Sequence, residues 1–206
     1  MIYIICYDWP STSGNHTGMR YLYEYIQKRN PELYKMYTFN MGRRFFDKGK
    51  KGKKISVLFT ALKLAMTYKS GDKFVLTEYL HRDSYQILFA KIIRFICPKA
   101  PIYAMVHLVP EKLERRYSKA QIKKSSRFVT EIVTLGSSLT CYLNKLGIEN
   151  VYTSFHYVDN NYYTPSANLY NRGGDVKVIV MGALARDFEQ IAYIVSRLPQ
   201  IHFYIC

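Results

Sequence analysis

The stretch Ile102-Tyr-Ala-Met-Val-His107 is a continuous apolar run that ends at a histidine, and residues with helical spacing follow it from Pro110. Similar short runs occur at residues 2–7, 33–39, 73–77, 128–135 and 151–155. Strands that are apolar along their whole length are buried on both faces of a sheet. The alternation of such strands with helical segments predicts an α/β fold with a doubly wound, Rossmann-like parallel sheet.

The helical segments between these strands are expected at residues 18–29, 55–68, 82–96, about 110–124 and 137–146. Residues 43–54 have the composition of a basic loop. Residues 159–175 are rich in Asn, Gly and Pro, which indicates a linker after a first domain of residues 1–158. Residues 176–206 then supply one β-α-β unit, too short to bury a core of its own. We therefore expect a fragment that ends inside a second α/β domain.

The composition points to an anionic partner. The 206 residues include 30 Lys and Arg against 15 Asp and Glu, a formal net charge of +15. Such a chain is attracted to nucleic acid, acidic lipid headgroups or phosphorylated substrates. The four scattered cysteines have the spacing of neither a zinc site nor a disulfide framework, and no metal is expected. The sequence has no recognisable secretory leader and no apolar run long enough to span a bilayer, so a cytoplasmic location is expected.

Ligands of parallel sheets bind beyond the carboxyl ends of the strands, and several polar residues follow those ends. Asn15, His16 and Gly18 follow the first strand, His107 ends the fourth, and Ser137 follows the fifth. The N–H groups at a helix that begins at Gly18 favour an anion, and His107 is able to exchange a proton or hydrogen bond. A plain turn at residues 13–18 and a structurally satisfied His107 are the alternatives.

Two groups of basic residues favour contact with phosphate or anionic lipid. The first surrounds two phenylalanines and comprises Arg43, Arg44, Phe45, Phe46, Lys50, Lys51, Lys53 and Lys54. The second recurs at helical spacing, as a stripe along one helix face, and contains Arg115, Arg116, Lys119 and Lys123. A solvated surface is the alternative for each group, and binding of nucleic acid is a third.

The order of several segments resembles a known family. These segments are His107-Leu-Val-Pro-Glu-Lys, Ser126-Arg-Phe-Val-Thr-Glu-Ile-Val-Thr-Leu-Gly-Ser137, Leu143-Asn-Lys-Leu-Gly-Ile and His156-Tyr-Val-Asp-Asn-Asn-Tyr-Tyr-Thr-Pro165. They are similar to retaining, metal-independent bacterial glycosyltransferases of the GT-B fold (families 4 and 1). Here Tyr157 and Tyr163 stand where the family's Gly-Val-Asp-x-x-x-Phe-x-Pro segment has glycine and phenylalanine.

The resemblance implies an N-terminal, acceptor-side Rossmann-like domain and the start of a donor domain. It implies that His107 contacts the transferred sugar, that Gly18 and Arg186 bind the donor diphosphate, and that Asn15, His16 and Ser137 line the cleft on the acceptor side. Thr17 replaces the glycine that usually precedes Gly18. No cofactor is implied, because the nucleotide sugar is itself the substrate.

The implied activity is hexosyl transfer from a nucleotide sugar to a glycan or lipid-linked acceptor, in synthesis of cell-envelope polysaccharide. Family members with lipid-linked acceptors dock on acidic membranes, so a peripheral position on the inner membrane face is implied as well. No nucleic acid is then expected as a partner, and the chain by itself is expected to be inactive. The alternatives are a basic nucleic-acid-binding α/β module without catalysis and a non-catalytic scaffold.

Overall fold

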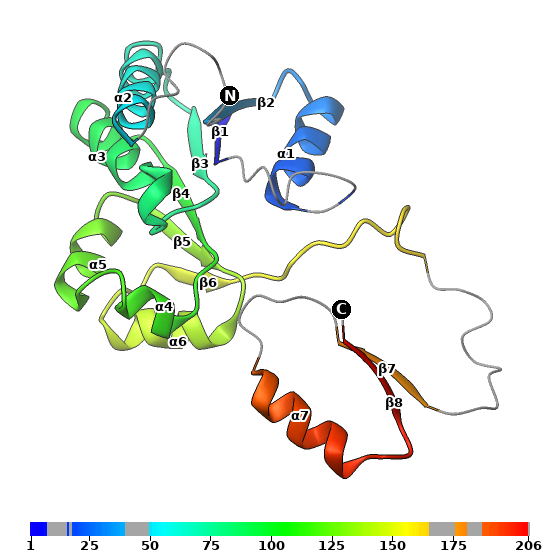
Figure 1. Cartoon of the computed structure of the whole chain (residues 1–206). Helices are drawn as coiled ribbons and strands as arrows, with labels where there is room; N and C mark the ends of the chain where they lie inside the picture. The colour runs from blue at the N-terminus through cyan, green and yellow to red at the C-terminus, as the bar shows by residue number, and fades with distance from the viewer. Residues whose placement is uncertain (8–15, 17, 40–49, 165–175, 181–186, 206) are drawn as a thin grey trace. The chain divides into compact units, whose positions relative to one another are not determined.

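The computed structural model describes residues 1–7, 16, 18–39, 50–164, 176–180 and 187–205 (Figure 1). The chain divides into two compact units, Met1–Tyr162 and Tyr163–Cys206. The first unit contains a six-stranded sheet in the order β2-β1-β3-β4-β5-β6, and every neighbouring pair is parallel. Its strands are β1 (Ile2–Tyr7), β2 (Tyr34–Phe39), β3 (Lys73–Leu76), β4 (Ile102–Val106), β5 (Glu131–Thr134) and β6 (Val151–Thr153). The predicted α/β class with a parallel sheet is thereby confirmed.

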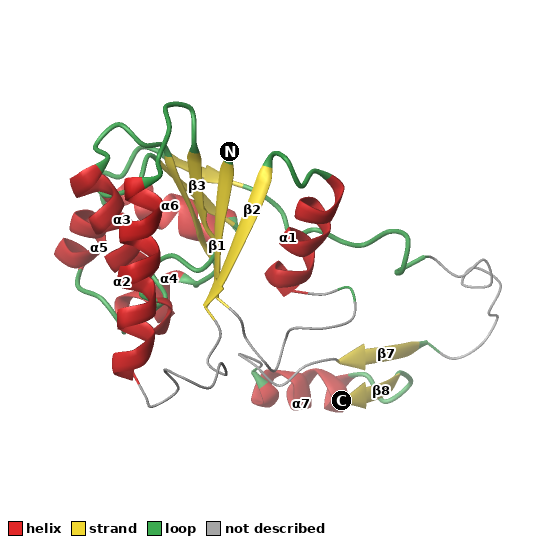
Figure 2. Ribbon diagram, turned by 90° about the horizontal axis from the view of Figure 1, so that it is seen from above, coloured by secondary structure: helices red, strands yellow, loops and turns green. Residues whose placement is uncertain are grey.

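Helices cover both faces of this sheet. They are α1 (Gly18–Arg29), α2 (Lys50–Met66), α3 (Gln86–Ile96), α4 (Pro110–Glu114), α5 (Lys119–Ser126) and α6 (Ser137–Lys145), with a short 3-10 helix at Arg82–Ser84. Figure 2 shows α1 on one side of the sheet and α2 and α3 on the other. This is the arrangement that right-handed crossovers give when the chain runs from β1 to β2 and then returns past β1 to β3.

The core lies where α3 packs on the central strands. Phe89 and Ile93 of α3 are fully buried, as are Phe74 and Leu76 of β3. The rings of Phe74 and Phe89 meet edge to face, with centroids 5.9 Å apart. Large apolar side chains that exclude water between α3 and this face of β3 stabilise the sheet through buried area and close packing.

Several predicted boundaries are wrong for local physical reasons. The helix expected at about 110–124 is two helices, because Ser118 and Gln121 form a capping box that starts α5 anew. The basic stripe is therefore not one helix face: Arg115 and Arg116 lie between α4 and α5. The helix expected at 82–96 is interrupted at Tyr85, whose φ of 54° is left-handed. Residues 50–54, expected in a loop, are the first turn of α2.

The second unit consists of β7 (Lys177–Val180), α7 (Phe188–Arg197) and β8 (His202–Ile205). The strands β7 and β8 pair in parallel in a sheet of their own. The carboxylate of Asp187 caps α7 by accepting a hydrogen bond from the backbone N–H of Gln190 at 3.0 Å. In the part of the chain that the structure describes, no helix is both long and apolar enough to cross a bilayer.

Candidate functional site

The strand order reverses between β1 and β3, and a ligand crevice of a parallel sheet forms outside the carboxyl ends of strands at such a point. One buried side chain ties these two strand ends together. Nε2 of Gln86 donates to the carbonyl of Ile5 at 2.9 Å, and its Oε1 accepts from the backbone N–H of Glu78 at 2.8 Å. Both bonds are buried, so they fix these two strand ends, which are the floor of the expected crevice.

The segment from Thr77 to Gln86 makes a tight bend at this floor. Leu80 has φ 58° and Tyr85 has φ 54°, a conformation that residues with a Cβ seldom adopt. The hydroxyl of Ser84 donates to the carbonyl of Glu78 at 2.7 Å and lies 2.8 Å from that of His81. These bonds offset the backbone strain and hold the bend in one shape.

His107 lies at the end of β4, beside this bend. Burial lowers its pKa to about 4, and nearby His156 adds to the effect, while a hydrogen bond to the backbone of Thr77 acts in the opposite direction. The ring is therefore neutral at pH 7. Its Nε2 is buried without a hydrogen-bond partner among the described residues, so the other nitrogen makes the bond to Thr77. A backbone carbonyl only accepts hydrogen bonds, so the ring nitrogen that bonds to the carbonyl of Thr77 carries the proton of the neutral ring. Nε2 therefore keeps a lone pair that is available to a ligand hydroxyl.

Two further groups surround His107 at the same edge. The ring of His156, which follows β6, meets His107 edge to face with centroids 6.2 Å apart. The hydroxyl of Thr77, at the end of β3, is a second buried polar atom without a partner among the described residues. Unsatisfied buried polar atoms are uncommon in folded proteins, and two at neighbouring strand ends suit a polar ligand or an ordered water.

A second cluster joins the start of α1 to the segment after β6. Nδ1 of His16 lies 2.6 Å from Oδ2 of Asp159, and the hydroxyl of Tyr21 donates to the same oxygen at 2.8 Å. These hydrogen bonds, from His16 first and Tyr21 second, lower the pKa of Asp159. The bond to Asp159 in turn raises the pKa of Tyr21 to about 12. The carboxylate thus stays ionised and orients the His16 ring.

Further contacts hold the same segment against α1. The ring of Tyr162 stacks on that of His16 at 3.9 Å, with the planes 8° apart. The hydroxyl of Tyr157 donates to the carbonyl of Gly18 at 2.6 Å. Gly18 itself has φ 80°, which suits a residue without a Cβ at the start of a helix. We name residues 156–162 the strap, because they cross from β6 to the N-terminal end of α1.

The structure places the other predicted residues as follows. Ser137 is exposed at the first position of α6, after β5, and lies at the same edge of the sheet as His107. The predicted basic residues whose side chains the structure describes are all exposed: Lys54, Arg115, Arg116, Lys119 and Lys123. The predicted residues that lie outside the described part of the chain are Asn15, Arg43, Arg44, Phe45, Phe46 and Arg186. The side chains of Lys50, Lys51 and Lys53 lie outside it as well.

Sequence reasoning placed His16 and His107 at strand ends but did not predict which side chains contact them. Tyr21 and Thr77 carry no motif, and Asp159 is 143 residues from His16 along the chain. The available signal was that the segment 156–159 directly follows β6, where a residue at the carboxyl edge is expected. Within the described ranges, no three His, Cys, Asp or Glu side chains are grouped so as to hold a metal ion.

No protein-family model matches the chain, and a search of the curated proteins finds no significant match. What the site is able to do must therefore be inferred from its residues.

Proposed function

We propose that this chain is the acceptor-side part of a metal-independent, retaining GT-B glycosyltransferase. In the proposed reaction, the bond between the anomeric carbon of the donor sugar and the diphosphate breaks, and the nucleoside diphosphate leaves. A bond from an acceptor hydroxyl to that carbon forms, and the hydroxyl proton is released. The acceptor is a glycan or a lipid-linked saccharide of the cell envelope.

The observation that supports this proposal best is the state of His107. Its ring is neutral, one nitrogen bonds to the backbone, and Nε2 has no partner among the residues that the structure describes, so Nε2 is suited to accept a hydrogen bond from a sugar hydroxyl. His107 lies beside the point where the strand order reverses, as a ligand crevice requires. The segment pattern around His107 and Asp159, described for the sequence, supports the same class of enzyme.

Anionic charge in the donor needs compensation, and two groups are proposed to supply it. The backbone N–H groups at the start of α1, near Gly18, favour an anion through the helix dipole. Arg186 is proposed as a second contact to the diphosphate. In both cases charge that develops on the leaving group is stabilised without a metal ion.

The test follows His107 directly. The histidine rings are labelled at Cε1, and the His107 resonance is identified as the one that a His107→Gln variant lacks. This resonance should shift on titration with nucleotide sugars. Oligonucleotide of equal charge should not shift it. If no nucleotide sugar moves this resonance while oligonucleotide does, the basic nucleic-acid-binding alternative is favoured and the transferase proposal is wrong.

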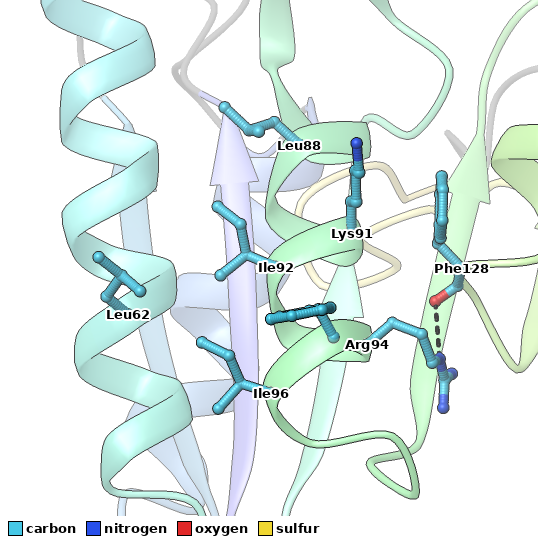
Figure 3. Close-up of a pocket in the computed structure, with 8 residues that line it drawn as sticks. Leu62, Leu88, Lys91, Ile92, Arg94, Ile96 and Phe128 are labelled. Atoms are coloured by element: carbon cyan, nitrogen blue, oxygen red, sulfur yellow. Dashed lines mark hydrogen bonds between the residues drawn. The ribbon is translucent and has the colours of Figure 1, made fainter.

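A peripheral position on an anionic membrane is part of this proposal, and the surface formed by α2 and α3 supports it. Phe59 and Met66 of α2 are 65% and 79% exposed, and Phe95 of α3 is 88% exposed. A hollow of about 580 Å³ lies on this surface. Figure 3 shows two of its lining side chains, Leu62 of α2 and Ile92 of α3. Exposed apolar side chains of this extent mark an interaction surface.

The composition of the two helices favours lipid as the partner of this surface. The helices α2 and α3 contain seven basic residues and no acidic one: Lys50, Lys51, Lys53, Lys54, Lys63, Lys91 and Arg94. Basic residues near an anionic bilayer each contribute about 1 kcal/mol of attraction. A second copy of the chain would bring the same positive charge, which opposes self-association.

Co-sedimentation with vesicles tests this part separately. We expect binding to vesicles with anionic lipid and little binding to neutral vesicles. Phe95→Ser should weaken the binding, whereas Phe155→Ser, which removes a ring 89% exposed after β6, should not. Equal effects of the two changes would show that the α2–α3 surface has no special role.

A further inference from the structure

The strap and α1 enclose a hollow that is separate from the His107 region and from the α2–α3 surface. Its volume is about 290 Å³, close to the lower end of the range for small-molecule sites. One wall comes from α1, with Tyr21 and Tyr25, and the other from the strap, with Tyr157. The contacts of Asp159 and Tyr157 to α1 hold these walls together, so the hollow is preformed.

The aromatic wall is rigid and partly open. The rings of Tyr21 and Tyr25 are stacked with centroids 6.5 Å apart, and the guanidinium of Arg29 lies over Tyr25 at 4.9 Å. These contacts fix the Tyr25 ring although the residue is 38% exposed. Val158 of the strap adds an apolar surface that is 63% exposed. A ligand with a flat apolar face fits such a wall.

The polar part of the lining comes from the strap, and among the residues that the structure describes the lining contains no Lys or Arg. Asp159 is the charged lining residue, and two neighbouring amides, Asn160 and Asn161, are exposed beside it. The backbone N–H of Asn161 donates to Oδ1 of Asp159 at 3.1 Å, so its side-chain amide is not used in that bond. Amides both donate and accept, which suits hydroxyl groups, whereas a carboxylate in the lining repels phosphate.

We infer that this hollow binds a neutral pyranose unit, with the sugar's C–H face on the tyrosine wall and its hydroxyls on Asp159, Asn160 and Asn161. No Lys or Arg among the described residues lines the hollow, which favours a neutral ligand over an anion even in a chain of net charge +15. The assignment of this pyranose to the acceptor rests on the proposed function. The binding of a pyranose in the hollow does not depend on that function.

The experiment uses the whole chain and a panel of methyl glycosides of glucose, galactose, mannose and N-acetylglucosamine. Saturation-transfer NMR should show contact to the ring C–H protons of at least one glycoside, with a dissociation constant on the order of 1 mM. Tyr25→Ala should raise that constant about three- to tenfold. Asn161→Ala, which keeps the backbone bond to Asp159, should also raise it.

The matched control is Tyr152→Ala, which removes a 56% exposed tyrosine of β6 that does not line the hollow. It should leave glycoside binding unchanged. The inference is overturned if no glycoside gives saturation transfer, or if the signal survives Tyr25→Ala and Asn161→Ala together, or if inorganic phosphate competes for it.

This outcome is separable from that of the transferase proposal. Glycoside binding is measured without any nucleotide sugar, and nucleotide-sugar binding is read at the His107 resonance. If glycosides bind at Tyr25 while no nucleotide sugar shifts the His107 resonance, the inference about the hollow is supported and the transferase proposal fails. If His107 responds to a nucleotide sugar and no glycoside contacts Tyr25, only the hollow is refuted.

Discussion

Acidification should destabilise the fold through His107. Its pKa is about 4 in the folded chain, because burial and the neighbouring His156 disfavour the charged ring, against an ordinary value of 6.5. Between these two values the unfolded chain binds more protons than the folded chain. Stability due to the neutral ring is therefore complete above about pH 6.5 and is lost as the pH falls toward 4.

The size of the effect follows from the two pKa values. Lowering the pH from about 7.5 to about 5 should remove about 2 kcal/mol from the free energy of unfolding, as the contribution of this ring alone. Urea unfolding at both pH values measures the total loss. Other groups titrate in the same range, so the comparison needs a His107→Gln variant, in which this contribution is absent.

We expect the pH-dependent loss to be about 2 kcal/mol smaller in His107→Gln than in the unchanged chain. A direct NMR titration of the His107 ring should give the same low pKa. The reasoning is refuted if the two proteins lose equal stability between the two pH values, or if the ring titrates near 6.5.

Three further changes test the packing that positions the site, each by urea unfolding at neutral pH. Gln86→Leu removes two buried hydrogen bonds at the crevice floor and should cost about 2–4 kcal/mol; a loss below about 0.5 kcal/mol would contradict its bridging role. Ser118→Ala should cost about 1 kcal/mol, and Gln121→Ala on top of it should add little, since both belong to one capping box. Phe89→Ala should cost about 3–5 kcal/mol, whereas Phe95→Ala in the same helix should change stability by less than about 0.5 kcal/mol.

The sequence was sufficient for the strands and the class of fold, because fully buried parallel strands are continuous apolar runs. It also placed His107 at a strand end, since the apolar run stops there. The break between α4 and α5 was also predictable from the sequence, because Ser118 and Gln121 have the spacing of a capping box. The helical spacing of the basic residues on both sides of this break was misleading.

The surroundings of the site were beyond sequence reasoning. Gln86 contacts Ile5, 81 positions away, and Asp159 contacts His16, 143 positions away. No periodicity encodes such pairs, because they depend on which strand ends the topology brings together. Likewise, the pKa of His107 depends on its burial and on a second histidine that follows a different strand.

The bridge made by Gln86 also constrains how the molecule moves. One amide group connects the ends of two strands to the first turn of α3, so none of the three is able to shift without the others. Any widening of the expected crevice must then come from parts of the chain outside this bridge, while its floor stays still. The amide proton of Glu78, enclosed in that bridge, should accordingly exchange with deuterium on the timescale of global unfolding.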